Sequence, residues 1–215
     1  MTTIIICIVA FLLLSGLAFM LIYTLPISMR VYRDTLVRTS PEKWGHVCSA
    51  TWHPEQSAMW EQGLAWAEQY KDHIREQWIE NDGLKLYGQY FDFGSDRCVV
   101  ILPGRCECLK YSYYFTEPYR KAGMNVLVID ARCHGLSEGT HPTIGVKESE
   151  DLRCWIKLLT DKLGNREIWL HGICVGTATA MCLLEQKNCP KAVKGLVTEG
   201  CYVSFRETFK RHMIA

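Results

Sequence analysis

The hydrophobic pattern of the first 29 residues differs from that of the rest of the chain. The run from Ile4 to Ile27 is almost wholly apolar and holds no charged residue, which is long enough to cross about 30 Å of hydrocarbon as a helix. No basic residue precedes the run and no small-x-small cleavage pattern ends it, so residues 1–29 are predicted to be a retained transmembrane anchor. Arg30, Arg33 and Arg38 follow. By the positive-inside tendency, they predict a single-pass membrane protein whose soluble part is cytoplasmic.

Residues 30–80 are predicted to be a juxtamembrane segment that contains an amphipathic helix. Between Pro54 and about Glu80 the sequence is polar, with apolar residues recurring at helical spacing. The helix could lie on the membrane or on the domain, and we favour packing of its tryptophans on the domain core. The apolar positions are Trp60, Leu64, Ala67, Ile74 and Trp78.

Residues 81–215 show short apolar runs that alternate with helical patterns. Asn81-Asp82-Gly83 separates two strand-like runs, Trp78–Glu80 and Leu84–Phe93, and Asp-Gly in that setting predicts a hairpin. The pattern as a whole predicts an α/β fold with a mainly parallel sheet that begins with an antiparallel hairpin. Continuous apolar runs typical of buried parallel strands are Cys98–Leu102, Asn125–Asp130, Ile168–Leu170 and Ala192–Val197. Helices are predicted up to Ala122 with a break at Pro118, over Leu152–Leu163, and from Val175 to about Gln186.

Composition and charge exclude several functional classes. The 215 residues suffice for one domain with a real core, and a net charge of +1 gives no reason to expect a nucleic-acid partner. Eleven cysteines without framework spacing favour reduced thiols. Cys106-x-Cys108 has no matching Cys/His pair, so no metal site is expected. Nucleotide-binding glycine motifs are absent, and no cofactor is implied.

The candidate chemistry lies where an apolar strand enters Gly172-Ile173-Cys174-Val175-Gly176 and then small residues. This order is typical of a nucleophile elbow, a sharp turn that presents one side chain at the edge of the sheet. The two glycines fit a turn too tight for side chains. A helix that begins at Val175 would help to lower the pKa of the Cys174 thiol, which would make it a nucleophile. The alternative is a small buried cysteine at a turn.

Three ordered motifs resemble the α/β-hydrolase superfamily: Leu102–Arg105, Asp130–Gly139 and His171–Gly176. More narrowly, the chain is similar to bacterial membrane-anchored hydrolases grouped with serine aminopeptidase-like and acylglycerol lipase-like sequences, over roughly residues 83–213. The resemblance implies an acyl-enzyme on Cys174, formed from an ester, thioester or amide. It also implies an oxyanion hole made by the backbone N–H groups of Val175 and Arg105, and a structural role for His134.

The triad acid and base are the part of the pattern that this chain does not match. In this fold they follow the nucleophile in the order Asp or Glu, then His, but only one further strand is predicted after Cys174. Glu199 and His212 occur in that order and are the substitute candidates. Because the Val193 strand would leave an apolar sheet edge open, we expect a piece of a longer hydrolase that lacks the usual triad acid and His.

Two functions therefore stay open. The first is a membrane-anchored hydrolase, and the second is a catalytically inactive, membrane-tethered domain that binds a ligand or partner. The anchor and the tryptophan-rich helix favour a lipid-like or small-molecule acyl substrate by analogy. The sequence does not indicate an oligomeric state.

Overall fold

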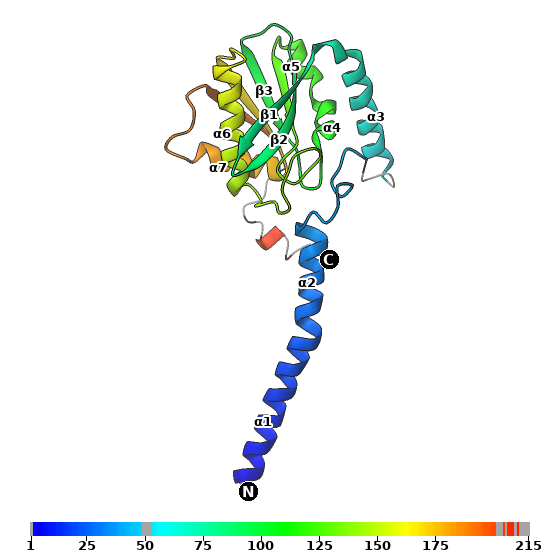
Figure 1. Cartoon of the computed structure of the whole chain (residues 1–215), viewed down its shortest axis with the longest axis vertical. Helices are drawn as coiled ribbons and strands as arrows, with labels where there is room; N and C mark the ends of the chain where they lie inside the picture. The colour runs from blue at the N-terminus through cyan, green and yellow to red at the C-terminus, as the bar shows by residue number, and fades with distance from the viewer. Residues whose placement is uncertain (1, 49–52, 201–203, 205, 209, 211–215) are drawn as a thin grey trace.

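A computed structural model describes residues 2–48, 53–200, 204, 206–208 and 210. It shows an α/β domain that stands at the end of one long helical rod (Figure 1). The rod consists of α1 (Thr2–Phe19), a π-helical turn η1 (Met20–Thr24) and α2 (Leu25–Leu36). By length and composition it could cross a membrane, and none of its most apolar window is buried. Residues 2–29 of the predicted anchor lie within this rod, which continues to Leu36.

The sheet has six strands in the order β1-β2-β4-β3-β5-β6. Strands β1 and β2 form an antiparallel hairpin, β2 is antiparallel to β4, and the other neighbouring pairs are parallel. Asp82 and Gly83 both have positive φ, 54° and 71°, as a two-residue hairpin turn requires. The predicted fold class and hairpin are therefore confirmed. The strands are β1 (Ile74–Asn81), β2 (Leu84–Phe91), β3 (Arg97–Leu102), β4 (Asn125–Ile129), β5 (Glu167–Ile173) and β6 (Val193–Glu199).

Helices cover both faces of the sheet. One face packs on α6 (Val146–Asp161) and α7 (Val175–Leu184), and the other on α3 (Pro54–Gln69), α4 (Leu109–Ser112) and η3 (Tyr113–Phe115). Alternate residues of β3 enter the two cores: Val100 and Leu102 face α6 and α7, whereas Val99 and Ile101 face the other side. Burial on both faces explains why β3 and β4 are continuous apolar runs. The remaining short helices are η2 (Lys71–His73) and α5 (Glu117–Lys121).

The predicted helix from Pro54 to Glu80 is wrong in its second half. Helix α3 ends at Gln69, and Ile74 and Trp78 lie on β1. A spacing of four residues puts two side chains on the same face of a helix and also on the same face of a strand, so this spacing could not separate the two. The preferred packing of the tryptophans on the domain is found for Trp60 of α3, whose ring centroid lies 4.7 Å from that of Tyr111, whereas Trp78 on β1 is 49% exposed. The predicted break at Pro118 is also found, since this proline lies in the first turn of a new helix, α5.

Candidate active site

The turn between β5 and α7 holds Cys174 in an unusual backbone conformation. Its φ of 51° and ψ of −109° are rare for a residue with a side chain, and its side chain is exposed. The flanking glycines are required by close backbone contacts: a Cβ on Gly172 would lie 2.5 Å from the Thr177 Cα, and one on Gly176 would lie 2.2 Å from the Leu102 carbonyl oxygen. The turn is therefore a sharp strand-to-helix connection that presents the thiol to solvent.

Hydrogen bonds fix this turn on both sides. The Cys174 N–H donates to the Glu199 carbonyl oxygen at 2.8 Å, which joins the turn to the end of β6. The Thr177 N–H donates to the Cys174 carbonyl at 3.1 Å, and the Thr177 hydroxyl donates to the Gly172 carbonyl at 2.7 Å. A non-glycine residue at positive φ costs about 1–3 kcal/mol, and these bonds hold the strained residue in place.

A narrow cavity of about 30 Å³ lies beside the turn, which is room for about one water molecule. The predicted oxyanion residues Arg105 and Val175 both line it. Arg105 lies in the loop after β3 and Val175 is the first residue of α7 after β5, and those two strands are parallel neighbours. The structure thus brings the two residues to one cavity, whose apolar wall is formed by Leu86, Leu102, Ile129, Ile144 and Trp155.

The loop that carries Arg105 is held by the half-buried carboxyl group of Glu107. Glu107 accepts a hydrogen bond from the Gly104 N–H at 2.8 Å, and burial raises the pKa of this carboxyl. A Cβ on Gly104 would lie 2.7 Å from a Glu107 oxygen. Gly104 therefore allows the carboxylate to approach the loop backbone closely.

The other end of the cavity contains a buried ion pair. Arg132 donates two hydrogen bonds to Asp151, from Nε at 2.8 Å and from Nη2 at 2.7 Å, and both side chains are nearly fully buried. Asn81 adds a third bond to Asp151 at 2.7 Å. A two-pronged Arg–carboxylate pair of this kind is geometrically specific, so it fixes the loop after β4 against α6 and the hairpin.

His134 also lines the cavity. Its Nδ1 lies 2.9 Å from the Arg132 carbonyl oxygen and must carry the proton there, which leaves Nε2 as an acceptor. Among the described residues Nε2 has no hydrogen-bond partner, and burial lowers the pKa of the ring. The ring stacks on Trp44, with centroids 4.8 Å apart. These contacts are compatible with the structural role that the resemblance implies.

The sequence did not single out His171, which lies on β5 close to Cys174. Its Nδ1 is 3.0 Å from the Tyr119 hydroxyl, and its Nε2 is 3.4 Å from a Glu199 carboxylate oxygen. Burial lowers the pKa of His171, and the nearby carboxylate opposes that shift. The candidate acid Glu199 thus lies at the end of β6 with its side chain toward His171. The candidate base His212 lies outside the described residues.

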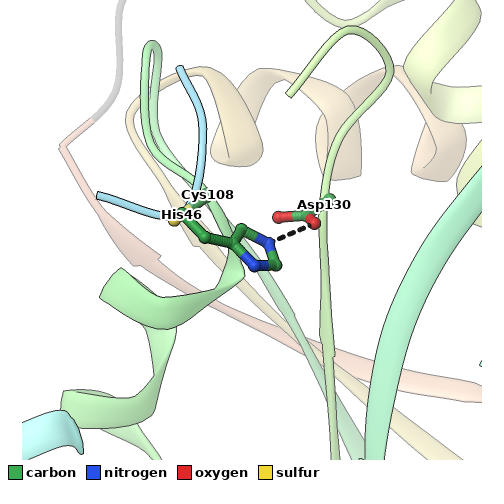
Figure 2. Close-up of side chains that lie close together, drawn as sticks. All are labelled: His46, Cys108 and Asp130. Atoms are coloured by element: carbon green, nitrogen blue, oxygen red, sulfur yellow. Dashed lines mark hydrogen bonds and ion pairs between the residues drawn. The ribbon is translucent and has the colours of Figure 1, made fainter. Parts of the chain in front are cut away.

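A second junction that the sequence did not predict joins His46 to Asp130. The His46 Nε2 lies 2.7 Å from an Asp130 carboxylate oxygen (Figure 2). The same carboxylate accepts the N–H groups of Leu109 and Leu136, at 2.7 and 2.8 Å. Cys108 completes a group of possible metal-binding atoms within 4.8 Å of one another, but hydrogen bonds already occupy both Asp130 oxygens. We therefore describe the group as a hydrogen-bonded junction between the segment before α3 and the loops after β3 and β4.

Comparisons with known proteins agree with this architecture. A family model described as the alpha/beta hydrolase fold matches residues 97–210. The esterase Pf2001 of Pyrococcus furiosus superposes with a TM-score of 0.59 at 28% identity, over 68% of this chain and 58% of the esterase. An alpha-beta hydrolase from Vibrio vulnificus gives a TM-score of 0.57 at 18% identity, over 82% of this chain and 67% of that protein.

One curated relative also matches. The uncharacterized protein YqkD of Bacillus subtilis is 38% identical over 74 residues, which are 34% of this chain and 23% of YqkD. The chain thus spans less than two thirds of the length of both YqkD and Pf2001. The family match covers more than half of the 215 residues, and the fold agrees with it. This chain belongs to the α/β-hydrolase fold family.

Proposed function

We propose that this chain is the nucleophile-bearing part of a membrane-anchored hydrolase that cleaves acyl bonds of ester, thioester or amide type, with Cys174 as the nucleophile. The observation that carries the proposal is the turn after β5, where an exposed thiol sits at φ 51° between two glycines that cannot be replaced without a clash. Strain retained at one residue on the surface is typical of a functional site. The esterase relative Pf2001 supports ester chemistry by its similarity.

In the proposed reaction the Cys174 sulfur attacks the carbonyl carbon and the alcohol, thiol or amine leaves. The backbone N–H groups of Val175 and Arg105 would stabilise the negative oxygen of the tetrahedral intermediate, and both residues line the same cavity. Water then attacks the acyl-enzyme and releases the acid. We assign the proton transfers to a histidine that follows β6 in the chain, as the order of residues in this fold requires, and His212 is the candidate in this sequence.

Membrane attachment is the second part of the proposal. The helical rod from Thr2 to Leu36 supports it by its length and its apolar, unburied surface. Arg30 and Arg33, at the end of the apolar run, favour a cytoplasmic location of the domain. A lipid-like or small-molecule acyl substrate fits such a location, and no cofactor is required for this chemistry.

The test is covalent labelling of the full chain in detergent with a thiol-directed acyl probe, together with hydrolysis of a short p-nitrophenyl ester. We expect labelling and turnover that are lost in Cys174→Ala. The matched control is Cys182→Ala, on the following helix, which we expect to leave both signals unchanged. Labelling that persists in Cys174→Ala would refute the assignment of the nucleophile.

The alternative is a domain that binds a ligand without catalysis. The observation in its favour is that each histidine near the turn has its Nδ1 held by a group other than Cys174: His134 by the Arg132 carbonyl oxygen and His171 by the Tyr119 hydroxyl. In that case Cys174→Ala and the unsubstituted chain would both fail to turn over the ester, and an acyl compound would raise the thermal unfolding temperature of both by the same amount.

A further inference from the structure

The segment between the rod and α3 is hydrogen-bonded to the domain. We call residues 37–48 the strap. Its Arg38 guanidinium donates to the carbonyl oxygens of Gly135 at 2.8 Å and Ser137 at 3.0 Å, and the Arg38 N–H donates to the Thr140 carbonyl at 2.8 Å. Farther along, the Gly135 N–H donates to the Trp44 carbonyl at 2.8 Å. The strap is therefore bonded along the loop that follows β4.

The strap is also bonded to the end of the rod. The Lys43 ammonium group donates to the carbonyl oxygens of Arg33, Asp34 and Val37, at 3.0, 2.8 and 2.6 Å. Such bonds cap the last carbonyl groups of a helix and favour a cation at that end. Tyr32 on α2 stacks on His141 of the same loop, with centroids 6.0 Å apart. The rod and the loop after β4 are thus connected, and Figure 1 shows that α2 ends next to the domain.

This connection fixes which edge of the sheet faces the end of the rod. The loop after β4 lies at the carboxyl end of that strand, and β3, β5 and β6 are parallel to β4 in the same sheet. The carboxyl ends of parallel strands lie at one edge, so Cys174 lies at that edge too. His134 of the loop lines the same cavity as Val175, which joins the strap-bound loop directly to the site.

The end of the rod marks the level of the membrane surface. The first charged residue after the apolar run is Arg30, and α2 ends at Leu36. Six residues of helix rise about 9 Å, so a rod whose apolar part spans the hydrocarbon would hold the loop within the layer of lipid headgroups.

Large apolar side chains are exposed on the segments at this edge. Leu136 in the loop is 52% exposed, Val146 at the start of α6 is 66% exposed, and Val47 in the strap is 59% exposed. Exposed apolar side chains gathered near a membrane anchor fit a lipid interface, which would remove their surface from water.

We propose that this edge of the sheet is a membrane-docking face, defined by Tyr32, Val47, Leu136 and Val146, which the strap holds against the lipid headgroups. Its partner is the bilayer surface that holds the rod. The acyl substrate would then enter the Cys174 site from the membrane and not from bulk solvent. The inference rests on the proposed anchor, but it does not depend on the chemistry of Cys174.

The experiment is photocrosslinking of the full chain in phosphatidylcholine–phosphatidylglycerol vesicles. The photoreactive residue is introduced as Leu136→p-benzoylphenylalanine and, separately, Val146→p-benzoylphenylalanine. The matched control is Lys162→p-benzoylphenylalanine, an exposed position after α6 at the opposite end of the parallel strands. We expect lipid adducts at Leu136 and Val146 on the order of tenfold above Lys162, because only the first two positions would reach lipid.

The strap is tested by adding Arg38→Gln to the Leu136 derivative. It removes the bonds to Gly135 and Ser137, and we expect the lipid adduct to fall several-fold while the chain still floats with vesicles. Arg33→Gln removes the same charge from an exposed side chain on α2 and should leave the adduct unchanged. A chain that floats but gives equal adducts at Leu136 and Lys162 overturns this inference alone. A chain that does not float overturns the anchor and the docking face together.

Discussion

At the scale of single residues, the site depends on places where the backbone leaves no room for a side chain. Gly172 and Gly176 flank Cys174 for this steric reason, whereas Gly83 in the hairpin turn is needed only for its positive φ. The glycines of the motif Gly-x-Cys-x-Gly are therefore needed because the turn packs closely against Leu102 and Thr177, two residues on different elements of the fold.

Gly176→Ala should strongly destabilise the domain. Its Cβ would lie 2.2 Å from a backbone oxygen of Leu102, and backbone cannot move aside cheaply. We expect a loss of about 3 kcal/mol or more in the free energy of unfolding, at the upper end for overpacking. Gly83→Ala is the comparison, since it meets open space and should cost only about 1–2 kcal/mol for its φ. Urea unfolding measures both, and equal losses would contradict the steric account.

The stability of the domain should fall as the pH is lowered below about 6.5. Burial lowers the pKa of His134 and of His171 in the folded state, so below the ordinary histidine value the unfolded chain binds more protons. The stability that each neutral ring contributes to the fold is thus fully present above about pH 6.5. It is lost as the pH falls toward the pKa of the ring in the folded state. Each histidine contributes at most about 1.4 kcal/mol per pH unit.

The variant that checks this is His134→Gln, compared with the unsubstituted chain by urea unfolding at several values between pH 5 and 8. The slope of stability against pH should become shallower in the variant. His73→Gln, at an exposed ring, serves as the control and should keep the original slope. An unchanged slope in His134→Gln would rule out this histidine as a source of the pH dependence.

At the scale of elements, buried polar contacts join parts that the hydrophobic pattern treats as separate. The Arg132–Asp151 pair connects the loop after β4 to α6, and Asn81 connects the same pair to the end of β1. The strap joins α2 to the loop after β4 in a similar way. These contacts decide where the loops beside Cys174 lie.

Arg132→Met should cost about 3–5 kcal/mol in the free energy of unfolding, because it leaves the buried Asp151 carboxylate without its cation. Lys147→Met is the matched change. Lys147 pairs with the half-exposed Asp82 at 2.6 Å and is itself more than half exposed, so we expect a loss below about 1 kcal/mol. Thermal or urea unfolding distinguishes the two, and similar losses would argue against the buried pair as a stabilising connection.

At the scale of the whole molecule, one side of the described sheet leaves apolar side chains exposed to solvent. Strand β6 is an outermost strand of the sheet. Val197 on β6 is 42% exposed, and Trp169 on the neighbouring β5 is 36% exposed. An exposed apolar strand at an edge offers free backbone groups and apolar surface to another chain.

Val197→Lys should therefore reduce self-association of the chain in detergent. A charge on an edge strand opposes pairing with a second strand, while the fold should be kept because this side chain is exposed. Sedimentation velocity over a concentration series measures the effect, and Lys194→Gln on the same strand provides the comparison. Equal association of the two variants would show that this edge is not where copies meet.

The sequence by itself determined those elements whose apolar residues fit a single secondary-structure pattern and whose ends are marked by turn residues. The strands β3 and β4 were predicted because burial on both faces requires continuous apolar residues. The Asp82-Gly83 turn was predicted because positive φ favours these residue types. The turn at Cys174 was also predicted, since a turn this tight has no room for side chains at the two glycine positions. The spacing of Ile74 and Trp78 misled the helix prediction, because four residues satisfy both helical and strand periods.

Only the tertiary structure decided which distant polar residues meet. Arg38, Trp44 and His46 lie in a stretch without periodicity, and their partners Gly135, His134 and Asp130 lie about 90 residues later. Such contacts arise from folding of the intervening sheet, and no local residue pattern encodes them. For the same reason, the orientation of the Cys174 edge relative to the apolar rod follows from the strap and the parallel strands together, and not from either segment alone.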